Sequence, residues 1–215
     1  MTDFLYPFLE GNERDVDSLL TDLARSANAK ADISNTLRSV TMAALDAHIE
    51  ATAIAMASRF DAGGRLFVFG NGGSSTDAAG TVALFGRPPE GTLLPAWSLV
   101  ADHAVLTALA NDVGYELVFS RQLISQAKHG DIALGLSTSG NSPNVVRAFL
   151  ESRRIGLLTI GLAGYDGGNM SSSGLIDHCL VVRSDSVHRI QEAQNAIVYN
   201  LWSRVQRLLT KGVLL

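Results

Sequence analysis

The sequence has few charged residues for its length. Only 18% of its 215 residues are Asp, Glu, Lys or Arg, against roughly 25% in ordinary soluble domains. Its net charge of -4 and isoelectric point near 5.7 provide no basic field of the kind that a phosphate backbone demands, so nucleic acid is not expected as a partner. A surface with so little charge is often hidden in an oligomer, and we therefore expect self-association.

Cysteine and long apolar runs are also scarce. A single cysteine, Cys179, excludes an internal disulfide, and the first residues, 1–4, lack the basic and then apolar build of a signal peptide. The apolar runs at 65–69 and 156–162 have the length of strands, whereas a membrane span requires ~20 residues. These absences predict a soluble cytoplasmic protein that does not enter a membrane.

The apolar pattern changes once along the chain. Over residues 12–61 apolar side chains recur at three- and four-residue spacing without a proline, which predicts a helical entry region. After Gly63 and Gly64, short apolar runs alternate with helical stretches, and a last periodic helix is expected over 187–211. The five expected strands cover residues 66–69, 97–100, 132–136, 157–160 and 179–182.

This alternation predicts an α/β fold with helices on both faces of a parallel sheet, because parallel strands need crossover connections and these are usually helical. The sequence contains no internal repeat, low-complexity tract or proline-rich linker at which to divide it. We expect one domain over residues 1–215, with residues 1–62 as its N-terminal helical extension.

A glycine-rich loop follows the first expected strand. Its sequence is Gly70-Asn71-Gly72-Gly73-Ser74, and a helix is expected to begin at Ser74. The glycines allow the backbone to approach a ligand closely. The free N–H groups and the positive end of the helix dipole at this point favour an anion or sugar hydroxyls.

Plainer interpretations of this loop exist. Ser74 and Asp77 could form a capping box, S-x-x-D, at an ordinary strand-to-helix turn. A dinucleotide fingerprint would need a third glycine where Ser75 stands, and no Gly-Lys-Ser/Thr of a Walker loop occurs. A nucleotide cofactor is therefore not expected.

A second polar loop follows the strand expected at 132–136. Ser137, Thr138, Ser139 and Ser142 surround Gly140, and the proline that comes next suits the first turn of a helix. Hydroxyls together with helix N–H groups can bind a phosphate dianion without Lys or Arg. One such loop would be weak support, since Ser, Thr, Gly and Asn also mark ordinary turns. Two of them in one parallel sheet are stronger, because such sheets bind ligands beyond the carboxyl ends of their strands.

The two loops belong to an ordered set of motifs. The four motifs are residues 69–74 with Asp77 and Ala78, residues 110–115 (Ala-Asn-Asp-Val-Gly-Tyr), residues 137–143, and residues 189–192 (Arg-Ile-Gln-Glu). With these motifs in this order and spacing, the sequence resembles the sugar-isomerase (SIS) domain family, and in detail the bacterial phosphoheptose isomerases, which interconvert sedoheptulose 7-phosphate and a heptose 7-phosphate. The resemblance runs from about residue 44 to 208.

The resemblance implies a flavodoxin-like three-layer sandwich with a five-stranded parallel sheet and added terminal helices. It also implies a homotetramer, with active sites completed by neighbouring subunits. By the same resemblance, Ser137, Thr138, Ser139 and Ser142 hold the phosphate of a sugar. The remaining pocket would be formed by Asn71, Gly72, Gly73, Ser74, Asn111, Asp112 and Gln191. From the residues alone, Asn111 and Asp112 could also be a polar turn, and Gln191 only a residue at a helix start.

The sequence departs from the family where the chemistry is expected. The family's enzymes use a glutamate on the helix after the first loop and a histidine on the last helix, often with zinc. An ungapped count from Ser74 puts Gly80 and Leu84 at the His and Glu positions of that helix, and a one-residue shift puts Ala83 at the Glu position. Tyr199 stands at the position of the last-helix histidine. The usual base, acid and metal ligands are therefore absent.

Substitutes for these groups are few. The five histidines show no pair at ligand spacing on one helix, so no metal is expected. His188 and Glu192 lie four apart at the start of the last helix and could replace the acid and base, although such a pair more commonly steadies a helix.

Two functions follow. One is an aldose-ketose isomerase of phosphorylated sugars with a rewired proton-transfer set drawn from Glu192, His188, Tyr199 or Asp77. The other is a non-catalytic sugar-phosphate sensor or scaffold with a possible protein partner, as in the replication-initiator-associating SIS protein. A nicotinamide or nucleoside-triphosphate enzyme is disfavoured by the failed fingerprints.

Overall fold

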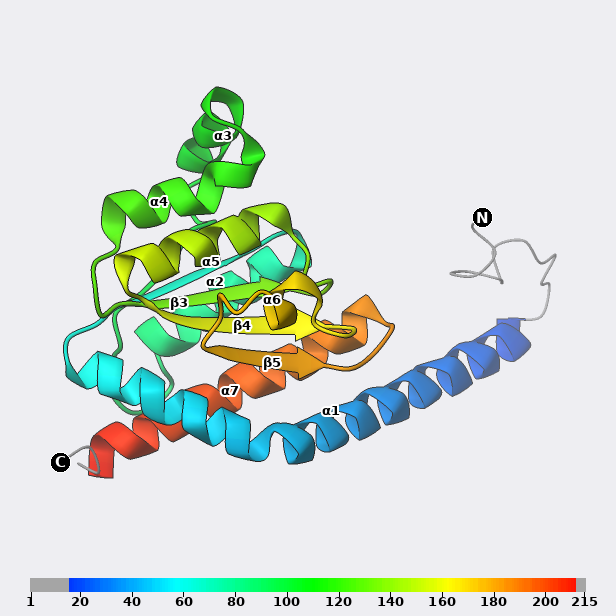
Figure 1. Cartoon of the computed structure of the whole chain (residues 1–215). Helices are drawn as coiled ribbons and strands as arrows, with labels where there is room; N and C mark the ends of the chain where they lie inside the picture. The colour runs from blue at the N-terminus through cyan, green and yellow to red at the C-terminus, as the bar shows by residue number, and fades with distance from the viewer. Residues whose placement is uncertain (1–15, 212–215) are drawn as a thin grey trace.

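The computed structural model describes residues 16–211, which form a parallel sheet between two layers of helices (Figure 1). The strands run in the order β2-β1-β3-β4-β5, all parallel, which is the flavodoxin-like order. The predicted three-layer α/β fold is confirmed. The strands are β1 (Leu66–Gly70), β2 (Ala96–Ser98), β3 (Ile132–Ser137), β4 (Leu158–Gly164) and β5 (His178–Val182).

Strands β1, β3 and β4 are buried along their whole length, as expected of parallel strands covered on both faces. Two strands differ from their predicted bounds by more than one residue. β2 ends at Ser98, so that the predicted residues 99 and 100 lie beyond it, and β4 continues four residues past Ile160 to Gly164. Glycine and alanine in this extension weaken the strand pattern. Gly161 must be small because an added Cβ would lie 2.8 Å from Met170 Cε.

Three helices cover one face of the sheet, and a set of shorter helices covers the other (Figure 1). On the first face lie α1 (Val16–Asp61), α2 (Gly73–Gly86) and α7 (Val187–Lys211). Each face has its own apolar core. The helices toward the second face are α3 (His103–Asp112), the 3-10 turn η2 (Tyr115–Leu117), α4 (Val118–Gln126), α5 (Pro143–Ile155) and the short α6 (Gly168–Ser172).

The first and last helices lie side by side and run in the same direction (Figure 1). The Arg204 guanidinium pairs with the carboxylates of Asp46 and Glu50, and Arg207 pairs with Glu50 at 2.9 Å. The bounds of α7 match those expected. For α1 the expected start, residues 12–15, lies outside the described residues.

The N-terminal half of α1 projects away from the sheet (Figure 1). Leu20 and Ile33 on this half are 57% and 48% exposed. By length and composition α1 could cross a membrane, which is weak support for a span because apolar helices of soluble proteins have the same properties. Within the described residues, most side chains of this half of α1 are exposed, apolar ones such as Leu20 and Ile33 among them.

Candidate functional site

The two polar loops lie next to each other at the carboxyl edge of the sheet. The first connects β1 to α2 and the second connects β3 to α5, and β1 and β3 are neighbouring strands. In their register Gly70 pairs with Leu136, one residue before Ser137. Both loops therefore begin at the same level, which is where parallel sheets bind ligands.

The second loop brings three of its four hydroxyl groups together. The Oγ of Ser137, a buried residue, lies 2.9 Å from Ser142 Oγ and 3.4 Å from Ser139 Oγ. Ser142 is the N-cap residue of α5, yet its side chain makes no capping bond to the helix, and Pro143 takes the first helical position as predicted. The hydroxyls are thus gathered at the positive end of a 13-residue helix.

Contacts with the loop after β4 fix the shape of the second loop. The Met170 N–H donates to the Gly140 carbonyl at 3.0 Å, and the Asn169 N–H donates to Asn141 Oδ1 at 2.8 Å. Gly140 has a φ of 66°, and a Cβ there would lie 2.1 Å from the carbonyl oxygen of Gly167. Only glycine allows the two loops to approach this closely.

The first loop lies beneath a side chain of the last helix. The amide of Gln191 covers Gly73, where an added Cβ would lie 2.3 Å from Gln191 Nε2. The same Nε2 donates to Asp77 Oδ2 at 3.1 Å, and Asn195 Nδ2 donates to the other carboxylate oxygen at 3.1 Å. The structure thus brings Gln191 together with the first loop, although the two are far apart in the sequence.

The capping-box interpretation of Ser74 and Asp77 is wrong. The helix begins at Gly73 with Gly72 as its N-cap and no side-chain cap. Ser75 Oγ instead donates to the Gly72 carbonyl at 2.6 Å, and Ser74 is buried. Asp77 bonds to α7 because that helix lies against this turn of α2, a contact that no local pattern could indicate.

Asn71 and Asn144 link the two loops directly. Asn71 Nδ2 donates to Asn144 Oδ1 at 2.8 Å, and Asn144 Nδ2 donates back to Asn71 Oδ1 at 2.9 Å. The Tyr115 hydroxyl also donates to Asn71 Oδ1, at 3.0 Å. Asn144 is not among the site residues predicted from the sequence. The only sign of its role in the sequence is a polar side chain directly after Pro143. Because Asn is common in the first turn of a helix, that sign does not distinguish a site residue.

A small cavity of about 110 Å³ lies between the first loop and α3. His103 lines this cavity, so the structure places a histidine beside the first loop. In the sequence His103 has no histidine partner at ligand spacing. Its lining residues are Gly70, Asn71, Gly72, Ser75, Val100, His103, Leu106, Tyr115 and Phe119.

Other predicted site residues are more peripheral. Asn111 and Asp112 are exposed at the end of α3, where Asn111 Nδ2 donates to Asp112 Oδ1 at 2.8 Å. His188 and Glu192 are exposed on α7, and within residues 16–211 no hydrogen bond or ion pair joins them. In the same range, no group of three or more His, Cys, Asp and Glu residues is placed to hold a metal ion. The binding and catalytic roles of all the predicted site residues, these four included, stay predictions.

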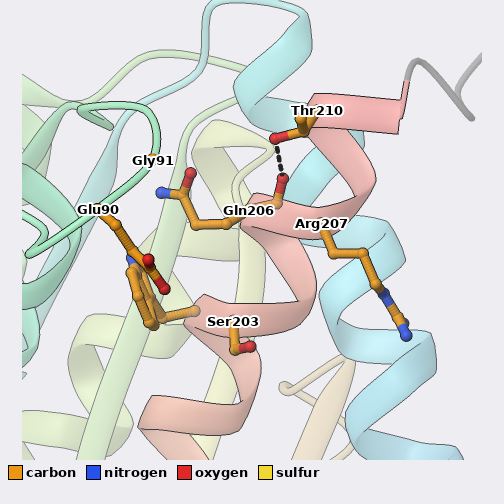
Figure 2. A pocket seen from close by; sticks show the side chains of 7 residues that line it. Glu90, Gly91, Ser203, Gln206, Arg207 and Thr210 are labelled. Atoms are coloured by element: carbon orange, nitrogen blue, oxygen red, sulfur yellow. Dashed lines mark hydrogen bonds between the residues drawn. The ribbon is translucent and has the colours of Figure 1, made fainter.

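A second, larger cavity of about 410 Å³ lies at the other end of α7 (Figure 2). Gln206 holds its wall in place, because its amide accepts from the Thr92 N–H at 2.8 Å and donates to the Thr92 carbonyl at 2.7 Å. Gln206 and Gln191 are 15 residues apart on α7, which is about 22 Å along a helix. This cavity is therefore separate from the two loops.

The fold and the two loops define a class of protein. The chain belongs to the SIS domain family, whose profile matches residues 30–164. Its relatives include the phosphoheptose isomerase of Citrifermentans bemidjiense, 42% identical over 167 residues, with 76% of this chain and 86% of that protein covered. The phosphoheptose isomerase of Pelobacter propionicus is 45% identical over 152 residues, covering 70% and 79% of the two chains.

A solved structure is similar over nearly the same span. The phosphoheptose isomerase from Neisseria gonorrhoeae superposes with a TM-score of 0.80 at 29% identity, covering 86% of this chain and 99% of that one. The prediction of an SIS protein resembling phosphoheptose isomerases is confirmed.

Proposed function

We propose that this protein binds a phosphorylated sugar, with the phosphate on the loop at 137–142 and the sugar against the loop at 70–74. The observation that carries the proposal is the cluster of Ser137, Ser139 and Ser142 hydroxyls at the start of α5, linked through Asn144 to the first loop. Charge-assisted hydrogen bonds from hydroxyls and helix N–H groups suit a phosphate dianion. The names of the relatives agree with such a ligand.

Calorimetry with sedoheptulose 7-phosphate, fructose 6-phosphate and inorganic phosphate tests the proposal. We expect the Ser142→Ala variant to bind each phosphate compound about tenfold more weakly, since one hydrogen bond to a charged group is lost. Ser203→Ala on the exposed surface of α7 is the matched control and should bind like the wild-type protein. Wild-type protein that binds none of the three compounds would refute the proposal.

Turnover is a second candidate function. Asp77 supports it, because its half-buried carboxylate lies one turn into α2, bonded to Gln191 above the first loop. Aldose-ketose isomerisation needs a group that moves a proton between C1 and C2, and a positioned carboxylate can do so. The exposed pair His188 and Glu192 is the alternative source of an acid and base.

Proton exchange distinguishes an isomerase from a sensor. If the protein is an isomerase, the C1 protons of a bound ketose phosphate exchange with D₂O, and NMR should detect their loss. Asp77→Asn should abolish this exchange, whereas His188→Gln should not if Asp77 is the base. Binding without exchange in the wild-type protein would instead support a non-catalytic sensor or scaffold.

Self-association would cover the exposed half of α1. An apolar groove of about 430 Å³ is lined there by Asp32, Ile33, Thr36, Leu37 and Val40. A second copy of the chain, as part of a homotetramer, is the proposed occupant. Sedimentation at micromolar concentration should give a tetramer, and Val40→Glu should reduce it. A wild-type monomer would contradict this.

The same proposal includes one SIS domain over residues 1–215 in the cytoplasm, with residues 1–62 as a helical extension. The single domain is supported by the packing of the second half of α1 against α7, which joins the extension to the same core as the sheet.

A further inference from the structure

We infer that Asn144 is a positioning residue that fixes the Asn71 amide as a hydrogen-bond donor, so that the first loop recognises an oxygen acceptor on the sugar. This inference rests on the proposed function, because it assumes that the two loops hold one phosphorylated sugar. It adds a specificity rule to that site.

The orientation of both amides follows from one backbone group. The Val145 N–H lies 3.0 Å from Asn144 Oδ1. A backbone N–H can only donate, so the Asn144 atom that it meets must be the oxygen. The nitrogen of Asn144 then faces Asn71, and the atom of Asn71 that receives its hydrogen bond must be the oxygen. The start of helix α5 therefore sets the orientation of a side chain in the neighbouring loop.

The hydrogen-bonding capacity of Asn71 is then nearly used up. Its Oδ1 has two lone pairs, and both accept hydrogen bonds, one from Asn144 Nδ2 and one from the Tyr115 hydroxyl. Its Nδ2 has two hydrogens, and one is donated to Asn144 Oδ1. One N–H of Asn71 is left for a ligand, and it can meet only an acceptor.

The pair is also rigid. Asn144 is only 3% exposed, and Asn71 is half-buried. Two reciprocal amide bonds and the Tyr115 bond oppose rotation of the Asn71 side chain, and a flipped Asn71 would face its nitrogen toward the nitrogen of Asn144. The free N–H is thus preorganised, which lowers the entropic cost of binding a hydroxyl or carbonyl oxygen.

The phosphate loop and the sugar loop can be tested separately. Calorimetry with inorganic phosphate reports the second loop alone, whereas sedoheptulose 7-phosphate reports both loops, so the ratio of the two affinities measures the sugar contribution. We expect Asn144→Ala and Asn71→Ala each to lower this ratio about tenfold, the effect of one hydrogen bond. Both variants should retain the wild-type affinity for inorganic phosphate.

A double variant separates positioning from general damage. Because Asn144 acts through Asn71, Asn71→Ala combined with Asn144→Ala should lose no more of the ratio than Asn71→Ala alone. The inference would be overturned if the double variant lowered the affinity ratio by the product of the two single-variant losses. A fall in the affinity of either single variant for inorganic phosphate would also overturn it. If Asn144→Ala does not fold, Tyr115→Phe removes the other hydrogen bond that orients Asn71 Oδ1. This change should lower the affinity ratio about threefold, and an unchanged ratio would overturn the inference.

The wild-type protein distinguishes this inference from the proposed function. Equal affinity for inorganic phosphate and the sugar phosphate would overturn the inference while leaving the phosphate site in place. Binding of neither compound would refute the proposed function and the inference with it.

Discussion

Gln191 holds Asp77 from above the first loop, with its Nε2 3.1 Å from Asp77 Oδ2 across 114 positions of sequence. The contact requires Gly73 beneath it, since a Cβ on that residue would meet Gln191 Nε2 at 2.3 Å. The glycine, the amide and the carboxylate thus form one unit at the carboxyl edge of the sheet.

Gly73→Ala should displace Gln191 and weaken binding of a sugar phosphate about tenfold, because the new methyl group occupies the position of the amide. Gly80→Ala on the same helix is the matched control. Nothing lies within 4 Å of a Cβ at Gly80, so that this change should leave binding unaltered and stabilise the helix by about 0.8 kcal/mol. Calorimetry and thermal unfolding measure the two effects. Wild-type binding by Gly73→Ala would show that the Gln191 position is unimportant.

Asp131→Ala should destabilise the fold by about 3 kcal/mol. Asp131 is fully buried at the start of β3, where it accepts hydrogen bonds from the Arg65 and Lys128 backbone N–H groups and from the Arg65 guanidinium at 2.8 Å. Its loss leaves these donors without an acceptor. Urea unfolding measures the free energy of unfolding of the wild-type protein and of each variant. Asp22→Ala, which breaks an exposed pair with Arg25, should change stability by less than about 0.5 kcal/mol. Equal effects of the two changes would contradict this account.

The Cys179 thiol should react slowly in the folded protein. Burial raises its pKa to about 11, and only the thiolate is a good nucleophile. At pH 8 the thiolate fraction is then about a hundredfold smaller than for a thiol with a pKa of 9. Alkylation by iodoacetamide, followed by mass spectrometry, should be correspondingly slow and should accelerate in guanidinium. Equal rates in folded and unfolded protein would show that the thiol is not protected.

His178 should make the fold less stable as the pH falls. Burial lowers the pKa of this imidazole, the neighbouring His48 lowers it further, and Asp177 opposes the shift. Its pKa in the folded state is thus below that in the unfolded state, so the unfolded state binds more protons. Stability is complete above the ordinary pKa near 6.5 and is lost as the pH falls through that value toward the lower folded-state pKa. His178→Gln should flatten the pH dependence of the free energy of unfolding, measured with urea, between about pH 7 and pH 5. A variant with the same pH dependence as the wild-type protein would contradict this account.

Local sequence was sufficient for the layers of the fold and for its two polar loops. Strands such as β3 are continuous apolar runs, and the loop after each is made of Gly, Ser and Asn, so that both the strand and its end can be recognised from neighbouring residues. The helix α7 was predicted to the residue because its apolar period is unbroken. Strand β4 was predicted too short because Gly161 and Gly164 have low strand propensity. Glycine is required at both positions because other segments pack closely against them.

The partners within the site were decided by tertiary structure. Asn144 meets Asn71 over a separation of 73 residues only because β1 and β3 are neighbours in the sheet. Asp77 bonds to Gln191 and Asn195 only because α7 returns across α2. The sequence by itself determined which residues follow each strand and hence which groups reach the carboxyl edge. The order of the strands and the return of the last helix determined which of these groups touch, because hydrogen bonds depend on distances in space that sequence separation does not set.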